Sequence, residues 1–303
     1  MSHSTEDQEK ESSKPGPAST SPGFSKLALK FTEKHRDLIR EYVHIQEMDE
    51  HKGEGVFCPV CESKFAKFAP YYPWQKTKIT AGMESSLKCP GCNSLQRHRL
   101  LWMYLQKKTS VFSDKPLRLL EFAPYESFFD AFSARANISY FPCDLHPDSL
   151  NFIDFKGKII RADIIDLEFP DEYFDIILCS HVLEHIPDDA KAISELFRVL
   201  KKDGHAIIQL PTDPTRAITY EDPSIVTPEE REAAFGQSDH VRLYGRDLGE
   251  RLAKPGFQVT ENEFVKSFST EETAYYGLDA EERLYVCTRV GRNSITGSGL
   301  RQA

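Results

Sequence analysis

Residues 169–188, FPDEYFDIILCSHVLEHIPD, decide the fold of this chain. Within them, Tyr173–Ser180 is a short apolar run of the length and composition typical of a buried strand. A helical run follows at Asp188–Leu200, and a second β-rich run comes after it at Gly204–Pro211. A strand, a helix and another strand in this order predict two parallel strands joined by a crossover helix.

The same alternation continues on both sides of this unit, from Lys115 to Arg289. Two more helical runs are expected, at Ser127–Ala136 and Tyr244–Lys254. The other β-rich runs are Leu117–Ala123, Ser139–Leu145, Lys158–Ile164, Phe257–Phe264 and Arg283–Arg289. Repeated βα units predict an α/β fold, a Rossmann-like doubly wound sheet with helices on both faces.

Composition and charge limit the function classes. The chain has 303 residues, 40% of them hydrophobic, which is enough for a sizeable core. Its net charge of −9 argues against a protein that coats nucleic acid through bulk charge. No apolar run approaches about 18 residues, so we expect no membrane span. The N-terminus lacks the layout of a signal peptide, and a chain with seven cysteines and no such signal is expected in the reducing cytoplasm.

Four segments are expected along the chain. Residues 1–25 are rich in Ser, Pro, Glu and Lys and are predicted to be a disordered tail. Residues 26–110 are predicted to hold a helix, at Ser25–His51, and then a cysteine-containing module. Residues 111–290 are predicted to form the α/β domain. Residues 291–303 are polar and are predicted to be a second disordered tail.

The cysteine-containing module carries two CxxC pairs. Cys58 and Cys61 form the first pair, Cys89 and Cys92 form the second, and 27 residues separate the pairs. Zinc takes four thiolates in a tetrahedral shell, and two CxxC turns supply all four. The spacing therefore predicts one structural Zn²⁺, since a closed shell leaves no position for a substrate. Cysteines without metal and a redox CxxC are the weaker alternatives.

This module is also locally basic. Residues 52–108 carry ten Lys or Arg and three Glu, a net charge of +7, with aromatic residues interleaved. Basic and aromatic residues together can indicate nucleic acid or a phosphorylated ligand, and the stretch best suited to touch an anion is SLQRHR at 94–99. We favour the alternative interpretation, a small aromatic core beneath a solvated basic surface.

Acidic residues stand at the ends of successive predicted strands. Glu121 ends the first strand, Asp144 ends the second, and Asp163 closes the third. In a doubly wound sheet such ends open into the crevice that binds ligands. A carboxylate at the end of the second strand suits a ribose, because its two oxygens can accept from two hydroxyls.

Together with these carboxylates, FPDEYFDIILCSHVLEHIPD and LFRVLKKDGHAIIQLP (196–211) resemble the class I S-adenosylmethionine-dependent methyltransferases over about Arg118–Arg289. The wider layout resembles a bacterial, Methyltransferase-11-like subfamily with a four-cysteine zinc module ahead of the domain. Two further stretches carry that likeness, SLQRHRLLW at 94–102 and YEDPSIVTPEEREAAFGQSDHVRLYG at 220–245. The resemblance implies a seven-stranded sheet in the order 3-2-1-4-5-7-6, with the last strand antiparallel.

The resemblance also implies S-adenosylmethionine as cofactor and assigns its contacts. It implies Glu121, Phe122 and Ala123 beside the methionine part, Asp144 and Leu145 at the ribose, Asp163 and Ile164 at the adenine, and Ser180 and His181 on the acceptor side. The first loop of the family usually reads E-x-G-x-G-x-G, whereas residues 121–127 contain no glycine. Glycine allows close backbone approach to a ligand, so this departure changes how the cofactor is held or abolishes its binding.

The implied reaction is transfer of a methyl group to an oxygen or nitrogen atom of a small-molecule or saccharide acceptor. An RNA methyltransferase that uses the basic module, and a non-catalytic scaffold with the same fold, are the alternatives. Calorimetry with S-adenosylmethionine separates the scaffold from both enzymes.

The connection after the fifth predicted strand, residues 211–242, is long and leaves the sheet at its carboxyl edge, so it is expected to bind the acceptor. His240 is predicted to be the general base, since histidine titrates near neutral pH, with Asp239 as its orienting partner. Arg242 and Tyr244 are predicted to bind the acceptor.

Two other histidines enter the prediction. His181 is the alternative general base. His185 follows the apolar Val182-Leu183 and is expected to point into the structure. For His240 itself, the alternative interpretation is a contact that only caps the following helix.

Overall fold

The structure, a computed structural model, describes residues 38, 41–70, 87–149 and 158–290. The chain forms two compact units, Met1–Ile45 and Gln46–Ala303. In the first unit residues 38 and 41–45 are helical, and in the second residues 46–50 are helical. The tails expected at 1–25 and 291–303 lie outside the described residues. Within the described part, no helix is long and apolar enough to cross a membrane.

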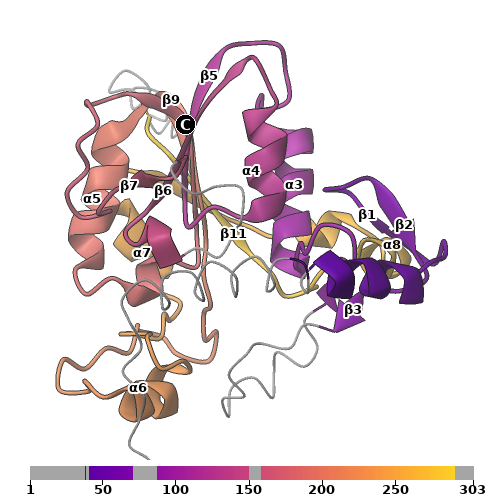
Figure 1. Ribbon diagram of the computed structural model, residues 1–303. Helices are drawn as coiled ribbons and strands as arrows, with labels where there is room; N and C mark the ends of the chain where they lie inside the picture. Colours follow the sequence, from indigo (N-terminus) through magenta and orange to yellow (C-terminus); the bar gives the residue numbers. More distant parts are fainter. Residues whose placement is uncertain (1–37, 39–40, 71–86, 150–157, 291–303) are drawn as a thin grey trace, which may run out of the picture. The chain divides into compact units, whose positions relative to one another are not determined.

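A seven-stranded sheet forms the centre of the second unit (Figure 1). In spatial order its strands are β10 (Gln258–Asn262), β11 (Leu284–Thr288), β9 (Leu200–Gln209), β8 (Phe174–Ser180), β5 (Leu117–Phe122), β6 (Ile138–Asp144) and β7 (Ile160–Arg161). β5 to β9 pair in parallel, and β11 is antiparallel to both of its neighbours. Numbered along the domain, this is the order 3-2-1-4-5-7-6. The predicted Rossmann-like sheet is therefore confirmed.

The three expected helices of the α/β domain are present, slightly shorter than predicted. They are α4 (Glu126–Ser133), α5 (Asp189–Val199) and α7 (Leu248–Ala253). The side chain of Asp188 caps α5 by accepting from the backbone N–H of Lys191. β9 begins directly after α5, so the strand starts four residues before the predicted Gly204.

Two helices fall where none was expected. α6 (Pro228–Phe235) begins after Thr227, and α8 (Thr270–Tyr276) begins after Ser269. In both cases the hydroxyl and a glutamate three residues later form a capping box. The S/T-x-x-E pattern was thus a readable signal for both starts. Among the described residues of the domain there are also three short 3₁₀ helices, η1 (Pro147–Ser149), η2 (Leu183–His185) and η3 (Phe264–Ser267).

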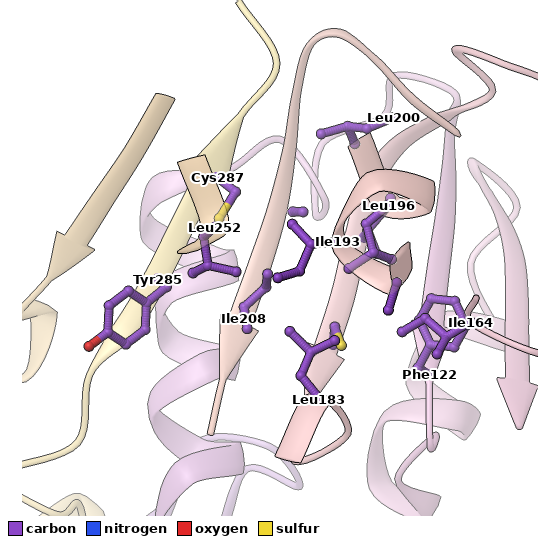
Figure 2. Packing of buried hydrophobic residues seen from close by; sticks show 14 of the residues in the cluster. Phe122, Ile164, Leu183, Ile193, Leu196, Leu200, Ile208, Leu252, Tyr285 and Cys287 are labelled. Carbon is purple, nitrogen blue, oxygen red and sulfur yellow. The ribbon is translucent and has the colours of Figure 1, made fainter. Parts of the chain in front are cut away.

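One face of the sheet is covered by α5 and α7. Figure 2 shows Ile193 and Leu196 of α5 and Leu252 of α7 packed near Ile208 and Cys287 of the strands. All five side chains are fully or almost fully buried. This packing fixes α5 against the strand that ends in Ser180, and so holds the segment between them in place.

The other face is covered by α3 (Gln96–Lys108) and α4, which stand on the opposite side of the sheet in Figure 1. Neighbouring residues of one strand divide between the two faces, Leu119 and Ile176 toward α3 and α4, Leu120 and Ile177 toward α5 and α7. A strand that is buried on both faces needs apolar residues at consecutive positions. The unbroken apolar runs in the sequence have this cause.

Two small antiparallel pairs form the cysteine-containing module. β1 (Val56–Cys58) pairs with β2 (Ser63–Phe65), and β3 (Ala69–Pro70) pairs with β4 (Leu87–Lys88). Phe65, Phe68 and the buried cysteines make its small core. The aromatic residues Tyr71, Tyr72 and Trp74 lie outside the described residues.

Arg99 joins this module to the α/β domain. Its side chain is fully buried and lies over the ring of Phe68. The guanidinium donates to the carbonyls of Ser94 and Leu87 on one side and of Tyr276 and Gly277 on the other. The positive charge of Arg99 is therefore compensated by backbone carbonyls inside the protein. Within the stretch 94–99, which was the part best suited to touch an anion, Arg99 is not available for that contact, because four carbonyl groups take its N–H donors.

Candidate functional site

The four cysteines of the two CxxC pairs converge at one point. Cys58 Sγ lies 3.6 Å from Cys92 Sγ, and Cys61 Sγ lies 3.7 Å from Cys89 Sγ. These distances are far too long for disulfides, which measure about 2.05 Å. They match the separation of about 3.8 Å between sulfurs held 2.3 Å from a tetrahedral zinc ion. All four residues are free cysteines, and their donor set fits a closed zinc shell.

Local backbone geometry brings the cysteine pairs together. Glu62 and Asn93 each follow the second cysteine of a pair, and both have positive φ, 55° and 58°. A left-handed residue at that point turns the chain back. The hydroxyl of Ser94 lies 3.3 Å from Cys58 Sγ and 3.2 Å from Cys92 Sγ.

The carboxyl ends of β5, β6 and β8 lie side by side in the sheet, as their register requires. Ala123 follows β5, and its N–H donates to the carbonyl of Cys143 in β6 at 3.0 Å. Ala123 has φ of 48°, in the left-handed region that favours glycine. The chain thus keeps a glycine-type conformation at the position where the family has its first loop glycine, although the residue is alanine.

Glu121 is buried at this edge, with 2% of its surface exposed. Tyr140 on β6 donates a hydrogen bond to its carboxylate. Burial raises the pKa of Glu121 to about 8, against the lowering effect of hydrogen bonds from Tyr140 and from the backbone of Tyr125. In the free protein at neutral pH this side chain is therefore mainly a neutral acid.

Tyr125 spans the first loop. Its hydroxyl donates to Ser180 Oγ at the end of β8, at 3.3 Å. Its ring lies 3.5 Å, centroid to centroid, from the ring of His98 in α3. Ser180 is itself buried and hydrogen-bonded to Gln209 of β9. The glycine-free loop thus places an aromatic side chain across the ends of two central strands.

The other predicted cofactor contacts differ in their accessibility. Asp144 is partly exposed, and its Oδ1 accepts from the backbone of His146 at 2.6 Å. Leu145 is 44% exposed. Asp163 is partly exposed and accepts from the backbone of Ile165 at 3.1 Å. Asp144, Leu145 and Asp163 can therefore reach a ligand.

Two of the predicted contacts lie inside the protein. The side chains of Phe122 and Ile164 are 3% and 4% exposed, and both belong to the core beneath α5 (Figure 2). For Phe122, this burial leaves the backbone as the group that could face a cofactor.

A cluster of histidines surrounds Glu184 just after β8. His181 Nδ1 lies 3.3 Å from Glu184 Oε1, and the rings of His185 and His240 meet edge to face at 4.7 Å. His181 has φ of 54°, and about a quarter of its side chain is exposed. Burial lowers the pKa values of both His181 and His240, which keeps these imidazoles neutral at pH 7.

Asp239 is paired with His185 rather than with His240. His185 Nδ1 lies 3.4 Å from Asp239 Oδ2 and 3.3 Å from its carbonyl oxygen. The hydrogen bond from His185 holds the pKa of Asp239 well below its usual range. His240 Nδ1 faces the carbonyl of Phe235 at 3.4 Å instead. The expected orientation of His240 by Asp239 has no support in this arrangement, and His185 is a partly exposed member of the cluster.

Arg242 and Tyr244 are engaged inside the protein. Arg242 is 3% exposed and donates to Glu221 and to the carbonyls of Leu183, Ile186 and Pro187. These bonds satisfy the carbonyls of the segment that carries the histidine cluster. The hydroxyl of Tyr244, a fully buried residue, donates to Asp189 at 2.8 Å. The geometry gives both residues a positioning role, which offers no support for their predicted contact with an acceptor.

Glu184 has no role in the site that the sequence predicts. Glu184 and His185 stand in the stretch that decides the fold, between the apolar Leu183 and Ile186. The sequence does carry a signal for Glu184 as a site residue, because a carboxylate stands directly before an imidazole between apolar residues. The contribution of His240, 55 residues further along the chain, needs the folded connection and could not be read from spacing.

Comparison with known proteins finds a methyltransferase domain in part of the chain. Residues 125–208 match the family model described as a methyltransferase domain. The ubiquinone/menaquinone biosynthesis C-methyltransferase UbiE of Vibrio campbellii is 29% identical over 123 residues, 39% of this chain and 46% of that protein. The same-named protein of Vibrio vulnificus is 30% identical over 137 residues, 43% of this chain and 51% of that protein. The chain spans about half the length of these curated relatives.

Solved structures with a similar chain path include the YcgJ protein from Bacillus subtilis, with 18% identity and a TM-score of 0.44 over 64% of this chain and all of that chain. An S-adenosylmethionine dependent methyltransferase from Mesorhizobium loti has 19% identity and a TM-score of 0.43, over 62% of this chain and 96% of that chain. The fold assignment here rests on strand order and register rather than on these likenesses.

The family match shows a methyltransferase domain at residues 125–208, and the sheet to which these residues contribute has the strand order 3-2-1-4-5-7-6. The cofactor and the reaction of the whole chain are the subject of the proposal that follows.

Proposed function

We propose that the chain transfers a methyl group from S-adenosylmethionine to an oxygen or nitrogen atom of a small-molecule or saccharide acceptor. One observation carries the proposal: Glu121 and Asp144 stand at the carboxyl ends of β5 and β6, and Asp163 follows the adjacent β7, in a sheet with the order expected for a methyltransferase. The Vibrio relatives are C-methyltransferases by name, but they match over only half of their length. We therefore do not assign their acceptor atom, carbon, to this chain.

The residues at the carboxyl edge fit the cofactor. Bound there, S-adenosylmethionine supplies a methyl group activated by a positively charged sulfur. Asp144 would accept hydrogen bonds from the ribose, and Asp163 would accept from the adenine amino group. Glu121 would face the ammonium group of the methionine part, whose positive charge favours the ionised form of this buried carboxyl.

His181 is the better placed of the two candidate bases. It stands directly after β8 and keeps part of its side chain exposed, whereas His240 is 7% exposed. A neutral imidazole at that position can take a proton from an acceptor hydroxyl or amine. Arg242 supports this role indirectly, because its bonds hold the segment that follows His181.

We also propose that Cys58, Cys61, Cys89 and Cys92 hold one structural Zn²⁺. The distances between their sulfurs and the closed four-thiolate set support it. With all four positions taken by protein, this ion would have no place for a substrate, so its contribution is to folding. The reduced state of all seven cysteines suits the cytoplasmic location expected from the sequence.

Calorimetry with S-adenosylmethionine tests the cofactor assignment. Asp144→Ala should weaken binding at least tenfold, since a hydrogen bond to a charged group contributes about 1.5–3 kcal/mol. Asp130→Ala, which removes an exposed carboxylate from α4, is the matched control and should bind like the wild type. Equal affinities for the Asp144 variant and the wild type would refute the ribose contact.

Two other outcomes distinguish the alternatives. If the wild type does not bind S-adenosylmethionine, Tyr125 and the glycine-free loop mark a non-catalytic scaffold. If it binds, transfer of a tritiated methyl group should be screened over cell extract fractions with and without nuclease. Loss of the labelled product after nuclease treatment would favour an RNA acceptor over the small-molecule or saccharide acceptor proposed here.

A further inference from the structure

Glu184 is a buried carboxylate without a hydrogen-bond partner. Its side chain is 1% exposed, and neither Oε1 nor Oε2 accepts a hydrogen bond within the part of the chain that the structure describes. The contact of Oε1 with His181 Nδ1, at 3.3 Å, lacks hydrogen-bond geometry. A buried ionised carboxylate is strongly unfavourable unless a cation or several donors compensate it. The fold therefore maintains a negative group whose natural counterpart is a positive ion.

Two imidazoles face this carboxylate, and each is held through its Nδ1. His185 Nδ1 is bonded to Asp239, and His240 Nδ1 is bonded to the carbonyl of Phe235. These contacts leave the Nε2 atom of each ring as the nitrogen that can bind a ligand. Histidines that bind metals show this pattern, with one nitrogen on the ion and the other on a carboxylate or carbonyl.

We propose that Glu184, His185 and His240 bind one divalent transition-metal ion, distinct from the zinc ion of the four cysteines. One carboxylate oxygen of Glu184 and one imidazole nitrogen of each histidine all lie within 4.8 Å of one another. Atoms bound at about 2.1 Å to one tetrahedral ion are roughly 3.4 Å apart, so small side-chain rotations would close the shell. Two imidazoles and a carboxylate favour Zn²⁺, Mn²⁺, Fe²⁺ or Co²⁺ over Mg²⁺ and Ca²⁺, which prefer oxygen ligands only.

The position of this ion gives it a role in the proposed methyl transfer, and this role rests on the proposed function. Three protein ligands leave at least one position open, and the cluster follows the carboxyl end of β8. A bound metal lowers the pKa of a coordinated hydroxyl group. The ion would bind the acceptor oxygen, whose proton passes to the imidazole of His181. The oxygen then bonds to the methyl carbon, and the electron pair of the broken carbon–sulfur bond stays on sulfur. The acceptor class is therefore a hydroxyl compound, and His240 is a ligand instead of the base.

Metal content tests the site without cofactor or acceptor. The full-length protein is equilibrated with excess Zn²⁺, passed through gel filtration, and analysed for zinc. The wild type should retain two ions per chain, and Glu184→Gln and His240→Gln should each retain one. His205→Gln is the matched control, because His205 is a half-buried histidine in the middle of β9, outside the cluster and hydrogen-bonded to Thr288. It should retain two ions.

A second measurement distinguishes loss of the metal site from loss of folding. Mn²⁺, which suits histidine and carboxylate ligands better than four thiolates, should raise the Tm of the wild type and of His205→Gln. It should leave the Tm of Glu184→Gln and His185→Gln unchanged, and both variants must show a cooperative melting transition. Wild type with a single zinc ion and no Tm shift, or a folded Glu184→Gln that retains two ions, would overturn the proposal. Neither measurement uses S-adenosylmethionine, so a failure of the proposed function, seen as absent cofactor binding, would be distinguishable from a failure of this metal site.

Discussion

The buried carboxyl of Glu121 should make stability depend on pH in a way that one substitution removes. Its pKa is raised from 4.5 to about 8 by burial. Between these values the folded chain keeps the proton and the unfolded chain releases it, so stability falls as pH rises and levels off above about pH 8. At 1.36 kcal/mol per pKa unit, the loss is about 3 kcal/mol at pH 7 and about 5 kcal/mol at pH 8 and above.

Glu121→Gln isolates this effect, because glutamine stays neutral and its oxygen can still accept from Tyr140. We expect the variant to be close to the wild type in stability near pH 4.5–5 and several kcal/mol more stable at pH 8. Urea unfolding followed by circular dichroism, at intervals from pH 5 to pH 9, measures the difference. Glu126→Gln, the control, changes an exposed glutamate five residues away. Its free energy of unfolding should differ from that of the wild type by the same amount at every pH. A difference between wild type and Glu121→Gln that stays the same at every pH would refute the reasoning.

Three further substitutions test other parts of the structure. Cys89→Ser should release the structural zinc ion and lower the Tm, and elemental analysis of a metal-free wild type that is fully stable would contradict this. Ala123→Gly should stabilise the free protein by up to about 1 kcal/mol in urea unfolding, because alanine is strained at its φ of 48°; a less stable glycine variant would show that the loop conformation is different. Arg99→Met should destabilise by about 3 kcal/mol or more, since four carbonyls lose a charged donor. A melting temperature within a degree or two of the wild type would exclude that role.

The sheet could be predicted because its cause is local and repeated. Strands buried on both faces need consecutive apolar residues such as Leu119 and Leu120, and that requirement is visible in the sequence. The cysteine pairs were equally readable, because a tetrahedral ion demands four ligands in two short turns. The positions of Glu121, Asp144 and Asp163 could be predicted as well, because a doubly wound sheet binds its ligand at the carboxyl ends of its strands.

The polar residues of the long connection could not be assigned in the same way. Arg242 looks like an anion contact in the sequence, but the carbonyls of Leu183, Ile186 and Pro187 require its donors. Those carbonyls belong to a segment more than 50 residues earlier, and a sequence pattern does not show which backbone groups lack partners. His240 and Asp239 illustrate the same limit: they are neighbours in the sequence, but Asp239 pairs with His185.

Helix α3 has a consequence for the way this protein can be divided. Residues 98–105 of α3 are buried on every side, because one side of the helix completes the cysteine-containing module and the rest lies on the sheet. A cut after residue 110 would remove Trp102 from its contact with Phe128, take Leu105 out of the core that it shares with the sheet, and expose an apolar face. The cysteine-containing module and the α/β domain are therefore two regions of one compact unit, and a cut between them would divide a shared core.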